Sequence, residues 1–159
     1  MGSRSTINFA YIAGFLDGDG SLMLQIKRRS DGMRRWRFMC TICFYQDSRH
    51  DKPLTWIRKV FGIGYFSRRN DGMSELRING FRQIKHIMQN LLPYIRFKQT
   101  QAKALLRASE ILSERSTRQL LPADLRELIN LMLVIQHDNY ITKRKKTRAE
   151  LYQIVGLTP

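Results

Sequence analysis

The chain has 159 residues, 43% of them hydrophobic, which suffices for one domain with its own core and excludes a disordered tail. Its 28 Lys+Arg against 13 Asp+Glu give a formal net charge of +15, so the expected partner is a polyanion or a membrane surface. No apolar run approaches the roughly 18 residues of a membrane span, which favours nucleic acid over a membrane.

The first predicted element is a short apolar helix over residues 9–16, with Thr6 or Asn8 as its cap. It is expected to end at the glycines of an Asp-Gly-Asp-Gly turn over residues 17–20. Residues 1–5, which precede the helix, are expected to be a flexible start or residues added to the natural chain.

Two stretches of alternating apolar and polar residues follow this helix. The even-numbered residues from 22 to 26 and from 36 to 44 are apolar, and the turn residues Ser30, Asp31 and Gly32 lie between the two stretches. Two alternating runs about a turn predict a long antiparallel hairpin with one buried face.

The rest of the chain predicts more helices and a second hairpin, whose Asp-Gly turn is a strong hairpin signal. The elements are a helix from Pro53 to the break at Gly62, a hairpin about residues 70–72, and helices over 81–92, 98–112, 123–137 and through Leu151 and Ile154. We predict an α+β fold: a helix-strand-strand-helix-strand-strand-helix core with an antiparallel, saddle-shaped sheet, plus C-terminal helices. It forms a single domain over residues 1–159.

The cysteines and histidines predict neither a disulfide nor a zinc site. Cys40 and Cys43 are three residues apart in a predicted strand, so their side chains should point to opposite faces. The histidines, His50, His86 and His137, have no ligand spacing with each other or with the cysteines. This usage indicates a reducing, intracellular setting.

The polar face of the predicted sheet is strongly cationic, whereas ordinary solvated faces mix charges of both signs. In a major groove, Arg and Lys read guanine, Gln reads adenine and Glu reads cytosine. The residues predicted to contact DNA are Gln25, Lys27, Arg29, Arg37, Thr41, Cys43, Ser67, Arg69, Glu75 and Arg77. The alternative is a face that is merely solvated.

The length of the strands suits a long DNA site. About nine strand residues at roughly 3.3 Å each reach about 30 Å, which matches about nine base pairs. A twofold dimer would therefore cover about 18 base pairs.

The segment 12–20 is not explained by composition. Ala13, Gly14 and Gly18 leave one helix face nearly bare, so that another backbone has room to approach closely. Two carboxylates then follow at the helix C-terminus, where the macrodipole disfavours them and a divalent cation would relieve the conflict. A turn that simply ends the helix is the alternative.

Other motifs for metal or phosphate do not match. Twelve positions counted from Asp17 end at Arg28, where an EF-hand requires a bidentate Glu. Neither a Walker-type phosphate loop nor an H-E-x-x-H zinc motif occurs.

Residues 11–21, Tyr-Ile-Ala-Gly-Phe-Leu-Asp-Gly-Asp-Gly-Ser, resemble the motif of LAGLIDADG homing endonucleases. The motif occurs once, as in the single-motif, homodimeric branch of intron-encoded members. Segments 62–65 and 92–102 also look like that branch, and the resemblance covers roughly residues 9–155. It implies a site-specific endonuclease that makes a staggered double-strand break in a long, roughly palindromic DNA site.

The resemblance also implies roles for individual residues. Asp19 matches the metal-binding acid, and the carbonyl of Gly18 matches a second ligand for Mg²⁺, with Mn²⁺ also accepted. Gln46 matches a residue that holds active-site water, and Lys98 matches the basic residue near that water and the scissile phosphate. A further basic residue corresponds to Arg49 or to His50. These imply catalytic roles for Asp19, Gln46 and Lys98.

A dimer interface and a phosphate-contacting segment are implied as well. Ala13, Gly14 and Asp17 are assigned to the interface between two copies of the motif helix. The basic run Lys143, Arg144, Lys145 and Lys146 resembles a segment that contacts phosphates, and a solvated charge cluster is its alternative. The expected partners are double-stranded DNA and a second copy of the chain, with no membrane and no organic cofactor.

Two other functions stay open: a maturase that binds its host intron RNA, and a DNA-binding regulator that does not cleave. Retention of Asp19, Gln46 and Lys98 favours the nuclease. The expected location is an organelle, chloroplast or mitochondrion, or a prokaryotic cytoplasm.

Overall fold

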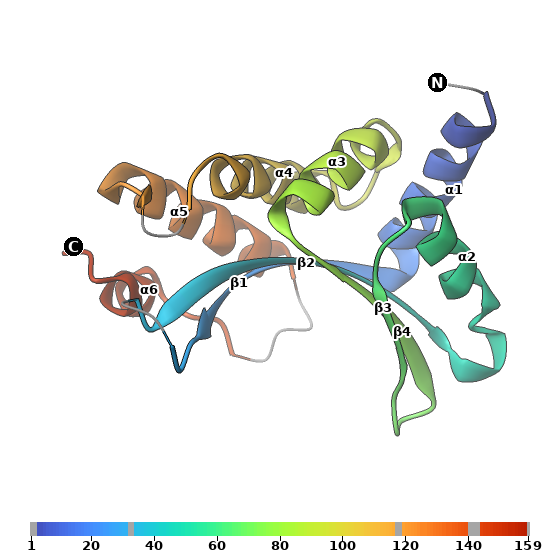
Figure 1. The fold of residues 1–159 in the computed structure, drawn as a ribbon, viewed down its shortest axis with the longest axis horizontal. Helices are drawn as coiled ribbons and strands as arrows, with labels where there is room; N and C mark the ends of the chain where they lie inside the picture. Colours follow the sequence, from blue (N-terminus) through green and yellow to red (C-terminus); the bar gives the residue numbers. More distant parts are fainter. Residues whose placement is uncertain (1–2, 32–33, 117–118, 140–143, 159) are drawn as a thin grey trace.

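A computed structural model describes residues 3–31, 34–116, 119–139 and 144–158, which form helices and one antiparallel sheet (Figure 1). The elements are α1 (Ser3–Asp19), β1 (Gly20–Arg28), β2 (Trp36–Asp47), η1 (Ser48–His50), α2 (Lys52–Phe61), β3 (Tyr65–Arg68), β4 (Met73–Asn79), α3 (Phe81–Leu91), η2 (Leu92–Tyr94), α4 (Gln99–Glu114), α5 (Pro122–Asp138) and α6 (Arg148–Val155). The predicted order of helices and strands is confirmed.

The sheet has the strand order β1-β2-β4-β3, and every neighbouring pair is antiparallel. The first hairpin pairs Gly20 with Phe44 and Arg28 with Trp36 at its two ends. β2 then pairs with β4, so that the two predicted hairpins join edge to edge into one sheet. Figure 1 shows this sheet to be strongly curved, with its concave side turned away from the helices.

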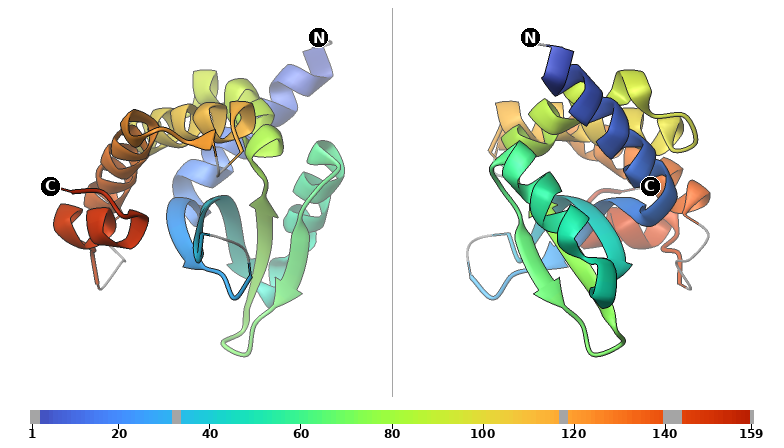
Figure 2. Two further views of the ribbon diagram at one scale, coloured as in Figure 1. Left: turned by 60° about the vertical axis from the view of Figure 1, so that its left-hand side comes forward. Right: turned by 90° about the vertical axis from the view of Figure 1, so that its right-hand side faces the viewer.

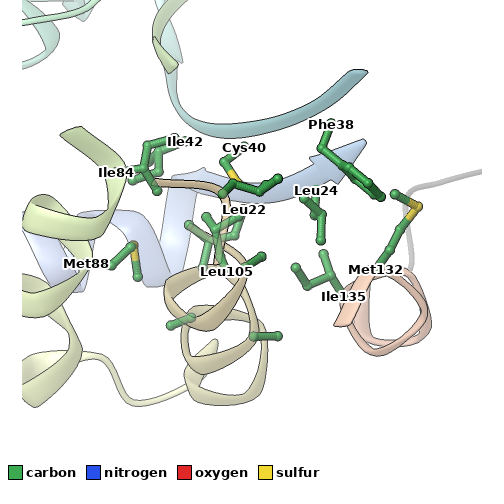
Figure 3. Packing of buried hydrophobic residues seen from close by; sticks show 14 of the residues in the cluster. Leu22, Leu24, Phe38, Cys40, Ile42, Ile84, Met88, Leu105, Met132 and Ile135 are labelled. Carbon is green, nitrogen blue, oxygen red and sulfur yellow. The ribbon is translucent and has the colours of Figure 1, made fainter. Parts of the chain in front are cut away.

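Helices cover one face of the sheet and bury its apolar residues. Leu22, Leu24, Phe38, Cys40 and Ile42 pack against side chains of α3, α4 and α5, as Figure 3 shows. These are the even-numbered positions of β1 and β2, so the predicted alternation is confirmed. We call the opposite side the open face; the odd-numbered residues of the four strands lie on it.

α1 differs from its prediction at both ends. It begins at Ser3, so Thr6 and Asn8 lie within the helix instead of capping it, and residues 3–5 are helical. It continues through Gly18 to Asp19, so the predicted Asp-Gly-Asp-Gly turn is wrong. The helix persists past the glycines because its packed face holds it in place: Ile12, Ala13, Leu16 and Asp17 are buried.

No helix in the described part of the chain is long and apolar enough to cross a membrane. Both cysteines are free and buried. Cys40 belongs to the core, whereas Cys43 lies on the open face opposite Ser21, which confirms that the two side chains point to opposite faces.

Candidate active site and nucleic-acid interface

The C-terminal end of α1 and the N-terminal end of α4 hold each other through Asp17 and Lys98. The Asp17 carboxylate accepts hydrogen bonds from the backbone N–H groups of Arg96 (2.6 Å), Phe97 (3.2 Å) and Lys98 (3.0 Å). In return, the Lys98 ammonium donates to the carbonyl oxygens of Leu16 (3.1 Å) and Asp17. The two Lys98 bonds satisfy carbonyl groups that the end of α1 otherwise leaves without partners, and the Asp17 bonds hold residues 96–98, which lead into α4.

Asp19 is the last residue of α1, and β1 begins directly after it at Gly20. Only glycine fits there, because a Cβ would lie 2.8 Å from the carbonyl oxygen of Leu16 and 2.9 Å from its Cα. Gly18 and Asp19 are exposed. The Asp19 carboxylate and the Gly18 carbonyl at this helix end are oxygen donors of the kind that Mg²⁺ prefers, so the residues present fit a divalent cation.

A cavity of about 770 Å³ opens at this junction, and Asp19 lies between two of its lining residues, Gly18 and Gly20. Burial lowers the pKa of Lys98, and the negative charges of Asp17 and Asp19 partly offset that shift. Asp19 is therefore near enough to Lys98 for the two charges to interact. The structure brings the predicted Asp19, Gly18 and Lys98 together. The lining includes Asp17, Gly18, Gly20, Ser21, Met23, Tyr45, Arg69, Met73, Phe97, Lys98, Gln101, Asp138 and Asn139.

Gln46 does not join the group formed by Gly18, Asp19 and Lys98. It lies near the end of β2 opposite Ser74, and its side-chain carbonyl accepts a hydrogen bond from the N–H of Asp47 (2.9 Å). Among the hydrogen bonds of the described residues, none joins Gln46 to Asp19 or Lys98. Its water-holding role stays a prediction.

The two candidates for the further basic residue lie in η1. Arg49 is paired with the Asp47 carboxylate through Nε (3.0 Å) and Nη2 (2.7 Å), and this pairing holds the pKa of Asp47 well below its usual range. His50 is exposed beside it. Arg49 thus has a carboxylate partner within its own loop, and the assignment between the two residues stays a prediction.

The open face carries the residues that the alternation placed there. Lys27 and Arg37 face each other across the first hairpin, and both are exposed. Arg29, one residue past β1, is paired with Asp31 at 3.2 Å. Gln25 and Ser67 are half-buried, and Arg69 and Arg77 have exposed fractions of 49% and 39%. These residues are accessible to a ligand on the open face.

Three of the predicted DNA contacts are buried, which corrects the prediction for their side chains. Thr41 is fully buried and donates a hydrogen bond to Asn79 Oδ1 at 2.7 Å. Cys43 is fully buried beneath its neighbours, and burial raises the pKa of its thiol. Glu75 is 7% exposed and accepts a hydrogen bond from Arg77 Nε at 2.7 Å. Alternation assigns a side chain to a face, but longer neighbours on that face cover these three.

The C-terminal basic run is only partly described, since Lys143 lies outside the described residues. Arg144 is exposed and lies 3.7 Å from Glu150. Lys145 donates to the carbonyl oxygen of His137 at 3.1 Å, and the backbone N–H of Lys146 donates to Gln136 at 3.2 Å. Contact of this run with phosphates stays a prediction.

The predicted dimer interface needs a correction as well. Ala13 is fully buried in the core, and Asp17 is engaged with the start of α4, so only Gly14 of the three is exposed. The exposed face of α1 instead carries Ile7, Tyr11, Gly14 and Gly18, at a helical spacing that was available in the sequence. Figure 2 (right) shows α1 and α2 together at the front of the molecule.

Residues that line the cavity and that the sequence analysis did not name include Tyr45, Asp138 and Asn139. The Tyr45 hydroxyl lies 3.2 Å from Ser21 Oγ, and burial raises the pKa of Tyr45 to about 12. The alternation of β2, extended by one residue, would have found Tyr45. Asn139 donates to the carbonyl oxygen of Leu22 at 3.2 Å and ties the end of α5 to β1; nothing in the sequence pattern indicates this contact.

The model of the family described as LAGLIDADG endonuclease matches residues 12–112. That range includes the C-terminal part of α1, both hairpins and Lys98, and it spans more than half of the chain. The chain belongs to the LAGLIDADG endonuclease family. Its resemblance to that family, noted from residues 11–21, is confirmed.

Two DNA endonucleases of the family are similar in sequence. I-CvuI from Chlorella vulgaris is 35% identical over 100 residues, which cover 63% of this chain and 62% of that enzyme. I-CreI from Chlamydomonas reinhardtii is 28% identical over 100 residues, which cover 63% of this chain and 61% of that enzyme. The chain thus matches less than two thirds of the length of these relatives.

Solved structures of the family share the whole fold. A crystal structure of I-CvuI with a DNA target and Mg has a TM-score of 0.86 at 27% identity, covering 99% of this chain and 100% of that chain. The archaeal intron-encoded I-Vdi141I, complexed with DNA, has a TM-score of 0.78 at 18% identity over 94% and 95% of the two chains. The α+β fold class predicted from the sequence is confirmed.

Proposed function

We propose that this protein is a homing endonuclease that makes a staggered double-strand break in a long, roughly palindromic DNA site by metal-dependent phosphodiester hydrolysis. The observation that carries the proposal is the junction of α1, β1 and α4, where Asp19, the Gly18 carbonyl and Lys98 meet at the edge of an open, cationic sheet face. The similar proteins named above are DNA endonucleases, which supports the same activity here.

Asp19 and Gly18 would hold the divalent cation, Mg²⁺ or Mn²⁺. Within the described residues there is no cluster of three or more His, Cys, Asp or Glu side chains that could hold a metal. Two protein oxygens from one chain leave the remaining positions to water, to phosphate and to a second copy, as is usual for Mg²⁺. When bound, the metal supplies an activated water and stabilises the charge on the leaving oxygen.

Lys98 is held so that it points its charge at the site. An ammonium group has three N–H donors, and two of them are engaged with the Leu16 and Asp17 carbonyl oxygens. The remaining donor is available to a phosphate oxygen or to the attacking water in the cavity. Asp17 acts through the backbone of α4, which it holds in place, and it is a positioning residue.

We propose that two copies associate through the exposed face of α1. The glycines at positions 14 and 18 have no heavy atom within 4 Å of where a Cβ would lie, so a second helix has room to approach. Ile7 and Tyr11, 65% and 59% exposed, would be covered by such a partner. A twofold axis along this face brings two Asp19 residues together, one for each DNA strand.

We propose that the open face reads the bases of each half-site. Exposed Lys27, Arg37, Arg69 and Arg77, with Gln25, provide donors suited to guanine and adenine edges. The run from residue 143 to 146 would add phosphate contacts, which position the protein without specifying sequence. We infer that the protein acts inside the cell on an organelle or prokaryotic genome.

The test is cleavage of a plasmid library that carries a randomised insert of about 22 base pairs, a length that covers two half-sites of the size expected from the strands. With Mg²⁺, linear product should accumulate from one related set of near-palindromic inserts, with staggered ends at their centres. Specific binding without cleavage in Mg²⁺ or Mn²⁺ would indicate a regulator instead. The proposal would be contradicted if the protein neither bound nor cleaved any insert.

A further inference from the structure

Glu75 is a buried carboxylate in the middle of the open face. On β4 it lies opposite Tyr45 of β2 on one side and Ser67 of β3 on the other, and only 7% of it is exposed. A buried charge is costly unless it is paired and hydrogen-bonded. The residues that pair with the Glu75 carboxylate therefore indicate its role.

The two oxygens of Glu75 face two different arginines. Oε1 accepts a hydrogen bond from Arg77 Nε at 2.7 Å, and Oε2 lies 4.0 Å from Arg69 Nη1. Arg69 is held from its other side by Asp71, 2.7 Å from Nη2. Arg77 lies in register opposite Cys43 of β2. Glu75 thus contacts both guanidinium groups, and Asp71 adds a second contact to that of Arg69.

Arg69 and Arg77 keep exposed surface and N–H donors that a ligand can contact. The side chains remain 39% exposed for Arg77 and 49% exposed for Arg69, on the face proposed to meet DNA. Arginine has five N–H donors in a rigid planar fork, so a single bond at Nε leaves further donors of Arg77 for a ligand. A side chain ordered before binding loses less conformational freedom on binding.

We propose that Glu75 is a positioning residue that makes Arg69 and Arg77 one unit of base recognition. The inference rests on the proposed function of the open face. Glu75 itself does not contact DNA; it sets the planes of the two guanidinium groups, and thereby the two base positions that they distinguish. Lys27 and Arg37 have no carboxylate partner within 4.0 Å in the described part of the chain, so their recognition should be independent of Glu75.

The experiment compares base preferences of Glu75→Gln and the wild type by binding to a DNA library at fixed salt, with Ca²⁺ in place of Mg²⁺. Gln keeps the shape of Glu but loses its charge. Arg69→Ala and Arg77→Ala first identify the base position that each arginine distinguishes. In Glu75→Gln, the preference at both positions should fall by about tenfold, the loss expected for a misplaced bidentate contact, and preferences elsewhere should be unchanged.

Glu127→Gln is the matched control. Glu127 accepts from Arg107 Nε at the same 2.7 Å, but this pair joins α4 and α5. Its base preferences should equal those of the wild type. Should Glu75→Gln unfold, Arg77→Ala tests the same idea, because it frees Glu75 to draw in Arg69, and the preference at the Arg69 position should change as well.

Two outcomes would overturn the inference while leaving the proposed function intact. One is a wild-type base profile in Glu75→Gln, and the other is a uniform loss of affinity at every position. An absence of sequence-specific binding by the wild type would overturn the proposed function itself, and with it the basis of this inference.

Discussion

Asp17 and Lys98 tie the end of α1 to the segment that leads into α4: the Asp17 carboxylate accepts from the N–H groups of residues 96–98, and the Lys98 ammonium donates to two carbonyls at the end of α1. The exchange is charge-assisted in both directions, and such bonds are stronger than neutral ones. It fixes Lys98 relative to Asp19, two residues beyond Asp17, so the same hydrogen bonds contribute to the stability of the fold and to the geometry of the candidate site.

Asp17→Asn should destabilise the protein by about 2 kcal/mol, because an amide is a weaker acceptor and turns N–H donors toward backbone N–H groups. For a chain of this size the melting temperature would fall by about 4–8 °C. Urea unfolding measures the change. The control is Asp31→Asn, in an exposed pair with Arg29, which should leave the stability almost unchanged. Equal effects of the two variants would contradict the role of Asp17 in joining α1 to residues 96–98.

Asp19→Asn should abolish cleavage and leave DNA binding within about threefold of the wild type, since it removes a metal ligand from an exposed position without touching the open face. Plasmid cleavage in Mg²⁺ and gel-shift binding on the same site measure the two effects. Lys98→Met is the companion variant, and it should lose cleavage together with stability because it strips two helix-end carbonyls of their donor. Retained cutting by Asp19→Asn would remove Asp19 from the metal site.

Gly14→Ala should affect folding and association in opposite directions. The space at Gly14 is open, so replacing a helical glycine should stabilise the folded chain by about 0.5–1 kcal/mol. If a second α1 packs closely there, the added methyl should weaken the dimer roughly tenfold or more by overpacking. Sedimentation equilibrium and urea unfolding separate the effects. Gln89→Ala, at an exposed position of α3, should leave association unchanged.

Asp51 should contribute to the decrease of the unfolding free energy at acidic pH. Hydrogen bonds from Arg68 (3.0 Å) and Ser74 (2.8 Å) hold the pKa of Asp51 below its ordinary value of 3.8. Because the folded-state pKa is the lower one, the contribution is fully present above the unfolded-state value and is lost as the pH falls through the folded-state value. The difference in unfolding free energy between the wild type and Asp51→Asn should therefore shrink below about pH 4.

Urea unfolding across the acid range measures this difference, and Arg68→Met is the informative control. It removes the main cause of the pKa shift, so in that background the pH dependence contributed by Asp51 should largely disappear. A difference that stays constant down to about pH 2 would show that Asp51 contributes through its shape alone.

The two hairpins and their faces could be predicted from the sequence, because a period of two is a local property of an extended chain. The apolar residues at even positions of β1 and β2 are buried, except for Ile26, which is partly buried. The Asp-Gly turn at Asp71 and Gly72 lies between β3 and β4. Gly18, Asp19 and Lys98, whose roles were inferred from resemblance to a family, lie close together in the structure, and those roles stay predictions.

What the tertiary structure alone decided is which side chains on each face are reachable. Thr41, Cys43 and Glu75 have the right parity for the open face, yet all three are buried. Asp17 was assigned to a dimer interface from the resemblance to a family, whereas its carboxylate accepts hydrogen bonds from the backbone of residues 96–98. The period and the spacing of residues are local properties of the sequence. Burial and hydrogen bonding depend on segments about eighty residues away, which only the folded molecule brings together.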